Sequence, residues 1–145
     1  MSNNDRYERA SHTVTDIQYH FVWITKYRYK VLKGKVALRC RELIIQGCEV
    51  YGIQILEGNI VSDHIHLHVK APATMSPTEI MQKLKGRSSR MLQEEFPELH
   101  KMYWGSHMWG RGYFCSAVGA VNEETIKSYI EDQGEEDNKN FKITE

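Results

Sequence analysis

Three histidines alternate with aliphatic residues in the stretch SDHIHLHV, which spans residues 62–69. Because successive side chains of a β-strand point to opposite faces, we expect the aliphatic side chains to face a core. The opposite face then carries the three imidazoles of His64, His66 and His68. Neutral imidazoles two residues apart on one strand can converge on a single metal ion. Polar residues on a solvated strand face alternate in the same way, so the spacing alone leaves both interpretations open.

A tyrosine and a glutamine near the end of the chain form a second candidate for chemistry. Tyr129 and Gln133 are four residues apart in a segment that we expect to be helical, so they share one helix face. An exposed amphipathic helix explains this spacing equally well, and neither feature alone identifies a reaction.

The elements that must position these residues follow from hydrophobic periodicity and from turn and cap signals. Ser76, Pro77 and Glu79 are typical of a capping box at a helix start. We expect strands at 13–25, 53–57, 63–70 and 113–121, and helices at about 34–52, 76–95 and 122–134.

This order is that of the ferredoxin-like, or split βαβ, arrangement. We therefore expect an α+β fold in which a four-stranded antiparallel sheet carries two helices on one face. A C-terminal helix holds Tyr129, and the second sheet face is left for function, for a partner or for that last helix.

The length of 145 residues predicts a single domain, with a folded body at about 13–134 and a charged tail at 135–145. The sequence shows no leading apolar segment and no apolar run long enough for a membrane span, so we expect a soluble, cytoplasmic protein that makes no membrane contact. The three cysteines lack CxxC spacing, which argues against a disulfide framework or a four-cysteine zinc site. Cys40 and Cys48 are expected to be small buried side chains.

Charge is unevenly distributed along the chain. Residues 123–145 contain eight acidic and three basic side chains, and the whole chain contains 19 of each, so residues 1–122 carry a net charge of +5. The asymmetry permits an anionic partner for the body of the chain.

Two segments are rich in basic residues, which suit phosphates, and the first also supplies aromatic rings on which bases can stack. Basic and aromatic residues alternate in KYRYK after the first strand, whereas KLKGRSSR in the second predicted helix is basic without an aromatic residue. A solvated basic face explains each segment as well. The candidate DNA-binding residues are Lys26, Arg28, Lys85, Arg87 and Arg90. Trp104 and Trp109 can either stack on bases or pack at a dimer interface.

Taken together, five segments in this order resemble the HUH single-tyrosine transposases of the smallest bacterial insertion sequences, to which the REP-associated tyrosine transposases are related. HUH denotes His-hydrophobic-His, which His64-Ile65-His66 matches. The segments are YHFVWITKYRYKVL, EGNIVSDHIHLHV, MQKLKGRSSRMLQEEFPEL, WGRGYFCSAVG and TIKSYIEDQ, and they extend from about Tyr19 to Gln133.

The resemblance implies a role for each matching residue. His64, His66 and Gln133 would bind a divalent metal, Mg²⁺ or Mn²⁺, and Tyr129 would be the nucleophile that forms a 5′-phosphotyrosine link. The implied activity is cleavage and rejoining of single-stranded DNA at insertion-sequence ends that carry hairpins. The implied assembly is a homodimer, in which the active site can be completed in trans.

The sequence does not assign a single role to two residues next to the motif, His68 and Asp63. His68 lies on the same predicted face and can be a neighbouring support, a phosphate contact or a solvated residue. Asp63 is expected to point to the opposite face and to cap the turn.

Three other functions compete with a mobile transposase. A domesticated relative would process chromosomal hairpins with the same residues. A ferredoxin-like nucleic-acid-binding module would lack catalysis. A metal-dependent hydrolase would use His64, His66 and His68 with an activated water.

Overall fold

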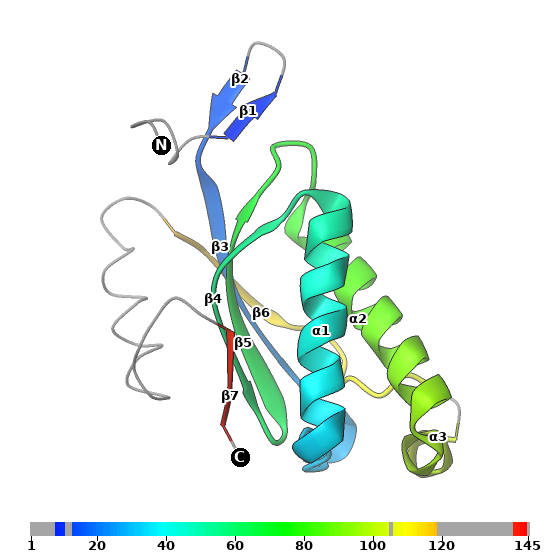
Figure 1. Cartoon of the computed structure of the whole chain (residues 1–145). Helices are drawn as coiled ribbons and strands as arrows, with labels where there is room; N and C mark the ends of the chain where they lie inside the picture. Colours follow the sequence, from blue (N-terminus) through cyan, green and yellow to red (C-terminus); the bar gives the residue numbers. More distant parts are fainter. Residues whose placement is uncertain (1–7, 11–12, 105, 119–140, 145) are drawn as a thin grey trace.

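The computed structural model describes residues 8–10, 13–104, 106–118 and 141–144, and its centre is a five-stranded sheet of order β6-β3-β5-β4-β7 (Figure 1). The strands of this sheet are β3 (Ile17–Ile24), β4 (Gln54–Val61), β5 (His64–Ala71), β6 (Phe114–Val118) and β7 (Phe141–Thr144). The helices are α1 (Gly34–Tyr51), α2 (Pro77–Glu95) and α3 (Pro97–Tyr103), and a 3-10 turn covers Lys26–Arg28. Two short strands, β1 (Glu8–Ala10) and β2 (Thr13–Thr15), pair with each other outside this sheet.

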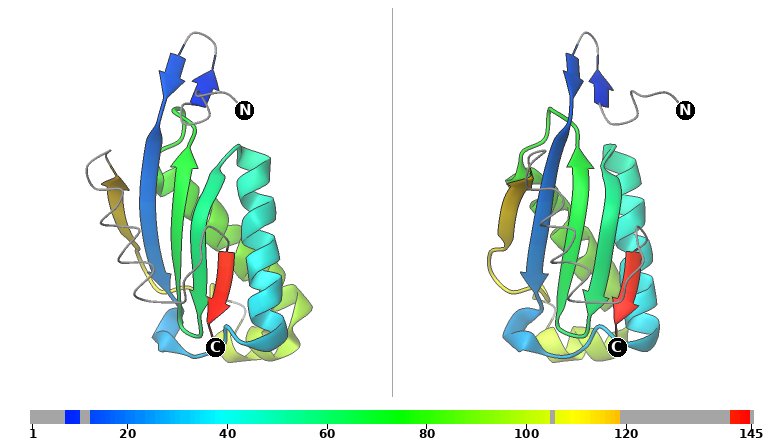
Figure 2. Two further views of the ribbon diagram at one scale, coloured as in Figure 1. Left: turned by 60° about the vertical axis from the view of Figure 1, so that its left-hand side comes forward. Right: turned by 90° about the vertical axis from the view of Figure 1, so that its left-hand side faces the viewer.

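Four of the five strands have the predicted topology. β3 is antiparallel to both β5 and β6, and β4 is antiparallel to β5. Helices α1 and α2 lie on the same face of the sheet, as both views of Figure 2 show. The expected ferredoxin-like α+β fold is therefore confirmed, and the second sheet face is not covered by α1, α2 or α3.

Both long helices begin and end where the sequence signals them. Gly52 takes a left-handed conformation after α1, with φ of 70°, and its backbone N–H donates to the carbonyls of Cys48 and Glu49. At the start of α2 the Ser76 side chain accepts from the Glu79 N–H, and the Glu79 carboxylate accepts from the Ser76 N–H. The predicted capping box is thus present and fixes the first turn of α2.

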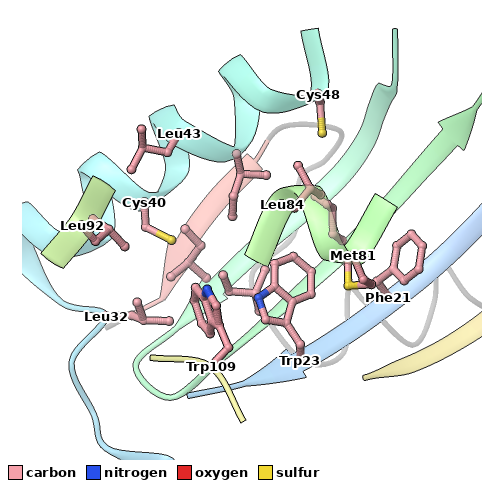
Figure 3. Close-up of a cluster of buried hydrophobic side chains, with 14 of the residues drawn as sticks. Phe21, Trp23, Leu32, Cys40, Leu43, Cys48, Met81, Leu84, Leu92 and Trp109 are labelled. Atoms are coloured by element: carbon pink, nitrogen blue, oxygen red, sulfur yellow. The ribbon is translucent and has the colours of Figure 1, made fainter. Parts of the chain in front are cut away.

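The core lies between the sheet and these two helices (Figure 3). The aliphatic side chains that alternate with the histidines on β5 are fully buried there, as predicted. Cys40 and Cys48 are buried as well, and burial raises the pKa of each thiol to about 12. These cysteines therefore behave as small apolar side chains and not as reactive thiols.

The C-terminal end differs from the expectation of a charged tail. Phe141–Thr144 form β7, which runs parallel to β4 at the edge of the sheet. The Arg41 side chain donates to the Phe141 carbonyl at 2.8 Å, and the Thr144 hydroxyl donates to the Asn59 side chain at 2.9 Å. Backbone pairing and these two side-chain bonds hold β7 in place.

Other differences are local. β4 continues to Val61, four residues beyond its predicted end, after an irregularity in its pairing with β5 between Ile55 and Glu57. A short helix, α3, follows α2 directly and was not among the predicted elements; Pro97 can begin a helix although it cannot continue one. No helix among the described residues is long and apolar enough to cross a membrane. The helix predicted at 122–134, with Tyr129 and Gln133, lies outside the described residues.

Candidate active site

The histidines of β5 lie on the sheet face opposite the core, as their alternation predicts. The ring centroids of His64 and His66 are 4.9 Å apart, and the two rings are close to perpendicular. His66 is only 4% exposed, whereas His64 is partly exposed. The pair therefore forms a compact imidazole site at the end of β5 that adjoins the β4–β5 turn.

A fourth histidine, which the sequence analysis missed, joins this row from the neighbouring strand. His20 lies on β3 directly opposite His68. Its ring stacks on that of His66 with a centroid separation of 5.9 Å and an interplanar angle of 15°. The signal was available, since Phe21 and Trp23 are core residues of β3 and alternation places His20 on the histidine face.

Burial determines the protonation state of the two stacked rings. Desolvation, supported by repulsion from neighbouring histidines, lowers the pKa of His20 and of His66 from 6.5 to about 4. Both imidazoles are therefore neutral near pH 7. Only the neutral ring has a nitrogen lone pair that can bind a metal ion.

The Asp63 carboxylate lies against His64, contrary to the expectation that Asp63 points to the other face. Its Oδ1 is 2.7 Å from His64 Nδ1, and its Oδ2 lies 3.1 Å from Arg28 Nε and 3.0 Å from the Arg28 terminal nitrogen. Burial alone would raise the pKa of this carboxyl, but the His64 hydrogen bond and the Arg28 guanidinium lower it on balance. Strand alternation does not apply to Asp63 because it belongs to the turn that precedes β5.

His68 makes its side-chain contact to β3. Its Nε2 lies 2.9 Å from the Oε1 of Gln18 on β3, and the Gln18 amide donates to Asp16 at 2.8 Å. At 3% exposure His68 is not a solvated residue, and a role toward a metal or a phosphate stays a prediction.

The residues present are compatible with a divalent ion, although they do not complete a site. Two adjacent imidazoles are a donor set that Mn²⁺, Zn²⁺ and similar ions accept. In the part of the chain that the structure describes, no group of three or more His, Cys, Asp or Glu side chains could hold a metal ion. An ion bound to this pair would need further ligands, and the predicted one, Gln133, is outside the described residues.

The predicted DNA-binding cations have different environments. Lys85 donates to the carbonyls of Gly110 and Gly112 at 3.0 and 2.9 Å, and Arg87 donates to Gln46 on α1 at 3.2 Å. Arg90 is exposed and reaches Glu94 only at 4.0 Å. Lys85 thus fixes the loop before β6, whereas Arg90 is the most accessible cation of the three predicted on α2.

The cations after β3, Lys26 and Arg28, lie in the 3-10 turn that follows this strand. The Lys26 N–H donates to the Met108 carbonyl, and its ammonium lies 5.5 Å from the centroid of the Tyr27 ring. Tyr27 and Arg28 both have positive φ, 62° and 56°. The Arg28 side chain remains 59% exposed while it pairs with Asp63.

The two tryptophans of the loop have separate roles. Trp109 is 1% exposed, donates its indole N–H to Ser88 at 2.9 Å and packs edge-on against Trp23. It is a core residue, so it is not available to stack on bases. Trp104 is 90% exposed and remains a candidate for stacking.

A family model described as "Transposase IS200 like" matches residues 13–133, which include the histidine strand and the predicted tyrosine helix. The chain belongs to the IS200-like transposase family. Its sequence is 37% identical over 127 residues to the transposase of insertion sequence element IS200 from Salmonella typhimurium, with 88% of this chain and 83% of the relative covered. The ISDra2 transposase TnpA of Deinococcus radiodurans is 29% identical over 120 residues, with 83% and 86% covered.

Solved structures agree with this family. A putative transposase from Deinococcus radiodurans R1 superposes with a TM-score of 0.71 at 28% identity, with 87% of this chain and 97% of the other covered. A REP-associated tyrosine transposase bound to a REP hairpin has a TM-score of 0.59 at 12% identity, with 86% and 68% covered, and shares the fold. The resemblance of the sequence to single-tyrosine transposases is confirmed, and the chain is a transposase of the IS200 type. The role of each site residue in this transposase stays a prediction.

Proposed function

We propose that this transposase cleaves and rejoins single-stranded DNA at insertion-sequence ends through a 5′-phosphotyrosine intermediate on Tyr129. His64, His66 and Gln133 would hold Mg²⁺ or Mn²⁺. The observation that carries the proposal is the contact between the His64 and His66 rings, on a sheet face that the described helices leave uncovered. When bound, such an ion polarises a phosphodiester oxygen and stabilises the charge that develops during displacement.

Tyr129 acts as the nucleophile in this proposal. A phenol has an ordinary pKa near 10, so it must lose its proton as it attacks. The phenol oxygen forms a bond to the scissile phosphorus, the bond from phosphorus to the 3′ oxygen breaks, and that oxygen leaves as a 3′-OH. Attack by a 3′-OH from another strand reverses these bonds, so rejoining needs neither ATP nor water.

The DNA contacts are proposed from exposed side chains. Arg90 on α2 and Arg28 after β3 are accessible to phosphates, and Trp104 offers an exposed ring for a base. Lys26, Lys85 and Arg87 were predicted for the same role. Because Lys85 and Arg87 already bond within the chain, we expect them to contribute less than Arg90.

A denaturing gel shift tests the proposal. The protein is mixed with labelled single-stranded DNA that carries its element's end hairpin, either with Mn²⁺ or with EDTA. We expect a covalent adduct that requires metal and is absent in Tyr129→Phe. Hairpin binding without any adduct would instead support a binding module, and a cleaved product that persists in Tyr129→Phe would support the hydrolase.

We further propose that the protein works as a homodimer in which the tyrosine of one subunit serves the histidines of the other. A mixture of Tyr129→Phe and His64→Ala subunits tests this arrangement, since each variant alone lacks one half of the site. Recovered cleavage in the mixture is the expected result. Inactivity of all mixed dimers would show that each subunit uses its own tyrosine.

A further inference from the structure

The carboxylate of Asp63 connects an arginine to the first histidine of the HUH motif. One oxygen lies 2.7 Å from His64 Nδ1, and the other accepts from Arg28 Nε at 3.1 Å and forms an ion pair with the Arg28 terminal nitrogen at 3.0 Å. The Asp63 side chain is only 13% exposed, so water has little access to compete for these bonds. The carboxylate is therefore held at both oxygens.

The backbone around this carboxylate is fixed independently of its side chain. The Asp63 carbonyl accepts from the Thr25 N–H at 3.0 Å and lies 3.3 Å from the Thr25 hydroxyl. The neighbouring Ser62 carbonyl accepts from the Leu32 N–H at 3.0 Å. The β4–β5 turn is thus attached to the segments before and after the 3-10 turn, and loss of the Asp63 carboxylate leaves these bonds intact.

The 3-10 turn brings Arg28 to this carboxylate in an unfavourable backbone conformation. Tyr27 and Arg28 are consecutive residues with positive φ, at 62° and 56°. A left-handed conformation is unfavourable for a residue other than glycine. Such strain persists only where the surrounding contacts outweigh it, and the Arg28–Asp63 pair is one of those contacts.

We propose that Asp63 is a positioning residue that holds neutral His64 in the Nδ1–H form, so that the lone pair of Nε2 is the atom offered to the metal. Arg28 in turn holds the carboxylate. This proposal rests on the proposed metal-binding role of His64. An ionised carboxylate only accepts hydrogen bonds, so the hydrogen between Asp63 and neutral His64 must be on Nδ1. Carboxylates that receive the second N–H of a metal-binding histidine orient the ring and increase its basicity.

The chain contains an internal reference for this protonation pattern. His107 Nδ1 lies 3.1 Å from the Trp109 carbonyl, which likewise can only accept. His107 should therefore be an Nδ1–H ring in the wild type and in any Asp63 variant. Its signal reports whether a variant keeps the native fold of the loop before β6.

The first experiment measures the protonated nitrogen directly. Long-range ¹H–¹⁵N spectra of the full chain in EDTA near pH 7.5 distinguish the two neutral forms of each histidine. We expect His64 in the Nδ1–H form in the wild type and a shift toward the Nε2–H form in Asp63→Ala, with His107 unchanged in both. A wild-type His64 in the Nε2–H form, or the same His64 spectrum in Asp63→Ala, would overturn the proposal.

The second experiment measures Mn²⁺ affinity by calorimetry in the same proteins. Loss of a carboxylate that supports a metal-binding histidine typically weakens metal binding by about 10- to 100-fold. We expect a loss of this size in Asp63→Ala, a smaller loss in Arg28→Gln and partial recovery in Asp63→Glu. Unchanged Mn²⁺ affinity in Asp63→Ala would overturn the role toward the metal.

Neither measurement depends on DNA cleavage. If the wild type shows the expected His64 spectrum and Mn²⁺ affinity but forms no DNA adduct, the proposed function fails and the positioning role of Asp63 stands. If the adduct forms and Asp63→Ala changes neither measurement, the proposed function stands and this inference fails.

Discussion

The imidazole rings of His20 and His66 stack across β3 and β5 at 5.9 Å, nearly parallel and both buried. Their pKa values of about 4 lie below the ordinary value of 6.5. The unfolded chain therefore binds more protons than the folded chain between these pH values. These two rings therefore do not lower the free energy of unfolding above about pH 6.5, and they lower it progressively as the pH decreases toward 4.

This relationship predicts acid sensitivity of the metal-free protein. At 1.36 kcal/mol per pKa unit, each ring can contribute at most about 3 kcal/mol to the loss between pH 7 and pH 4. Urea unfolding in EDTA at several pH values measures it. His20→Gln should flatten the pH dependence, because one of the two buried rings is removed. If the unfolding free energy of this variant depended on pH as strongly as that of the wild type, the contribution assigned to His20 would be contradicted.

The contact between Gly58 and Phe141 gives a prediction for β7. A Cβ at Gly58 would lie 2.6 Å from the Phe141 ring, so Gly58→Ala should displace the ring and weaken the docking of β7. Hydrogen exchange of the β7 amides should increase in this variant. Gly86→Ala is the matched control, since a Cβ at Gly86 in α2 has no atom within 4 Å and should add up to about 1 kcal/mol of stability. Unchanged exchange in β7 for Gly58→Ala would contradict this prediction.

Substitution of Lys85 is expected to reduce stability, whereas substitution of Arg90 is expected to reduce DNA binding and leave stability nearly unchanged. Lys85→Met removes the donor to the Gly110 and Gly112 carbonyls and should cost about 1–3 kcal/mol in urea unfolding. Arg90→Gln should change stability by less than about 0.5 kcal/mol. If Arg90 contacts a phosphate, its loss should weaken DNA binding at all sequences and reduce the salt dependence by about one counterion. Equal effects of the two variants on stability would contradict their different environments.

Trp104 combines an exposed ring with a backbone conformation that suits glycine. It follows α3 with φ of 56°, so Trp104→Gly should leave stability unchanged or raise it by about 1 kcal/mol. If the ring stacks on a base, the same variant should lose about 1–3 kcal/mol of single-strand affinity, and Trp104→Phe should retain most of it. Fluorescence titration with a hairpin that carries a single-stranded flank measures the affinity of each variant. Equal affinity of all three proteins would exclude stacking by Trp104.

Local signals predicted most of the fold. The capping box of Ser76 and Glu79, the glycine stop at Gly52 and the alternation along β5 each specify an element through contacts within a few residues. β7 could not be predicted in this way. Phe141–Thr144 are a strand because β4 offers a free parallel edge and Gly58 leaves room for the Phe141 ring, and neither partner is near in sequence.

Only part of the site was predicted, because its other contacts also join residues that are distant in sequence. His64 and His66 follow from one strand, but the packing of His20 against His66 requires the pairing register of β3 with β5. The Asp63 contact was missed because strand alternation was applied one residue too early, to a residue of the turn. Lys85 was interpreted as a DNA contact because its two carbonyl partners lie more than twenty residues away in sequence.

The position of β7 also has a consequence for the edge of the sheet. β7 pairs with β4 and so covers the edge of β4 that β5 does not pair with. Release of β7 would leave those backbone groups of β4 unpaired, and an unpaired strand edge is a template for pairing with another chain. The few contacts around Phe141 therefore help to decide whether this edge of β4 stays closed to strands of other molecules.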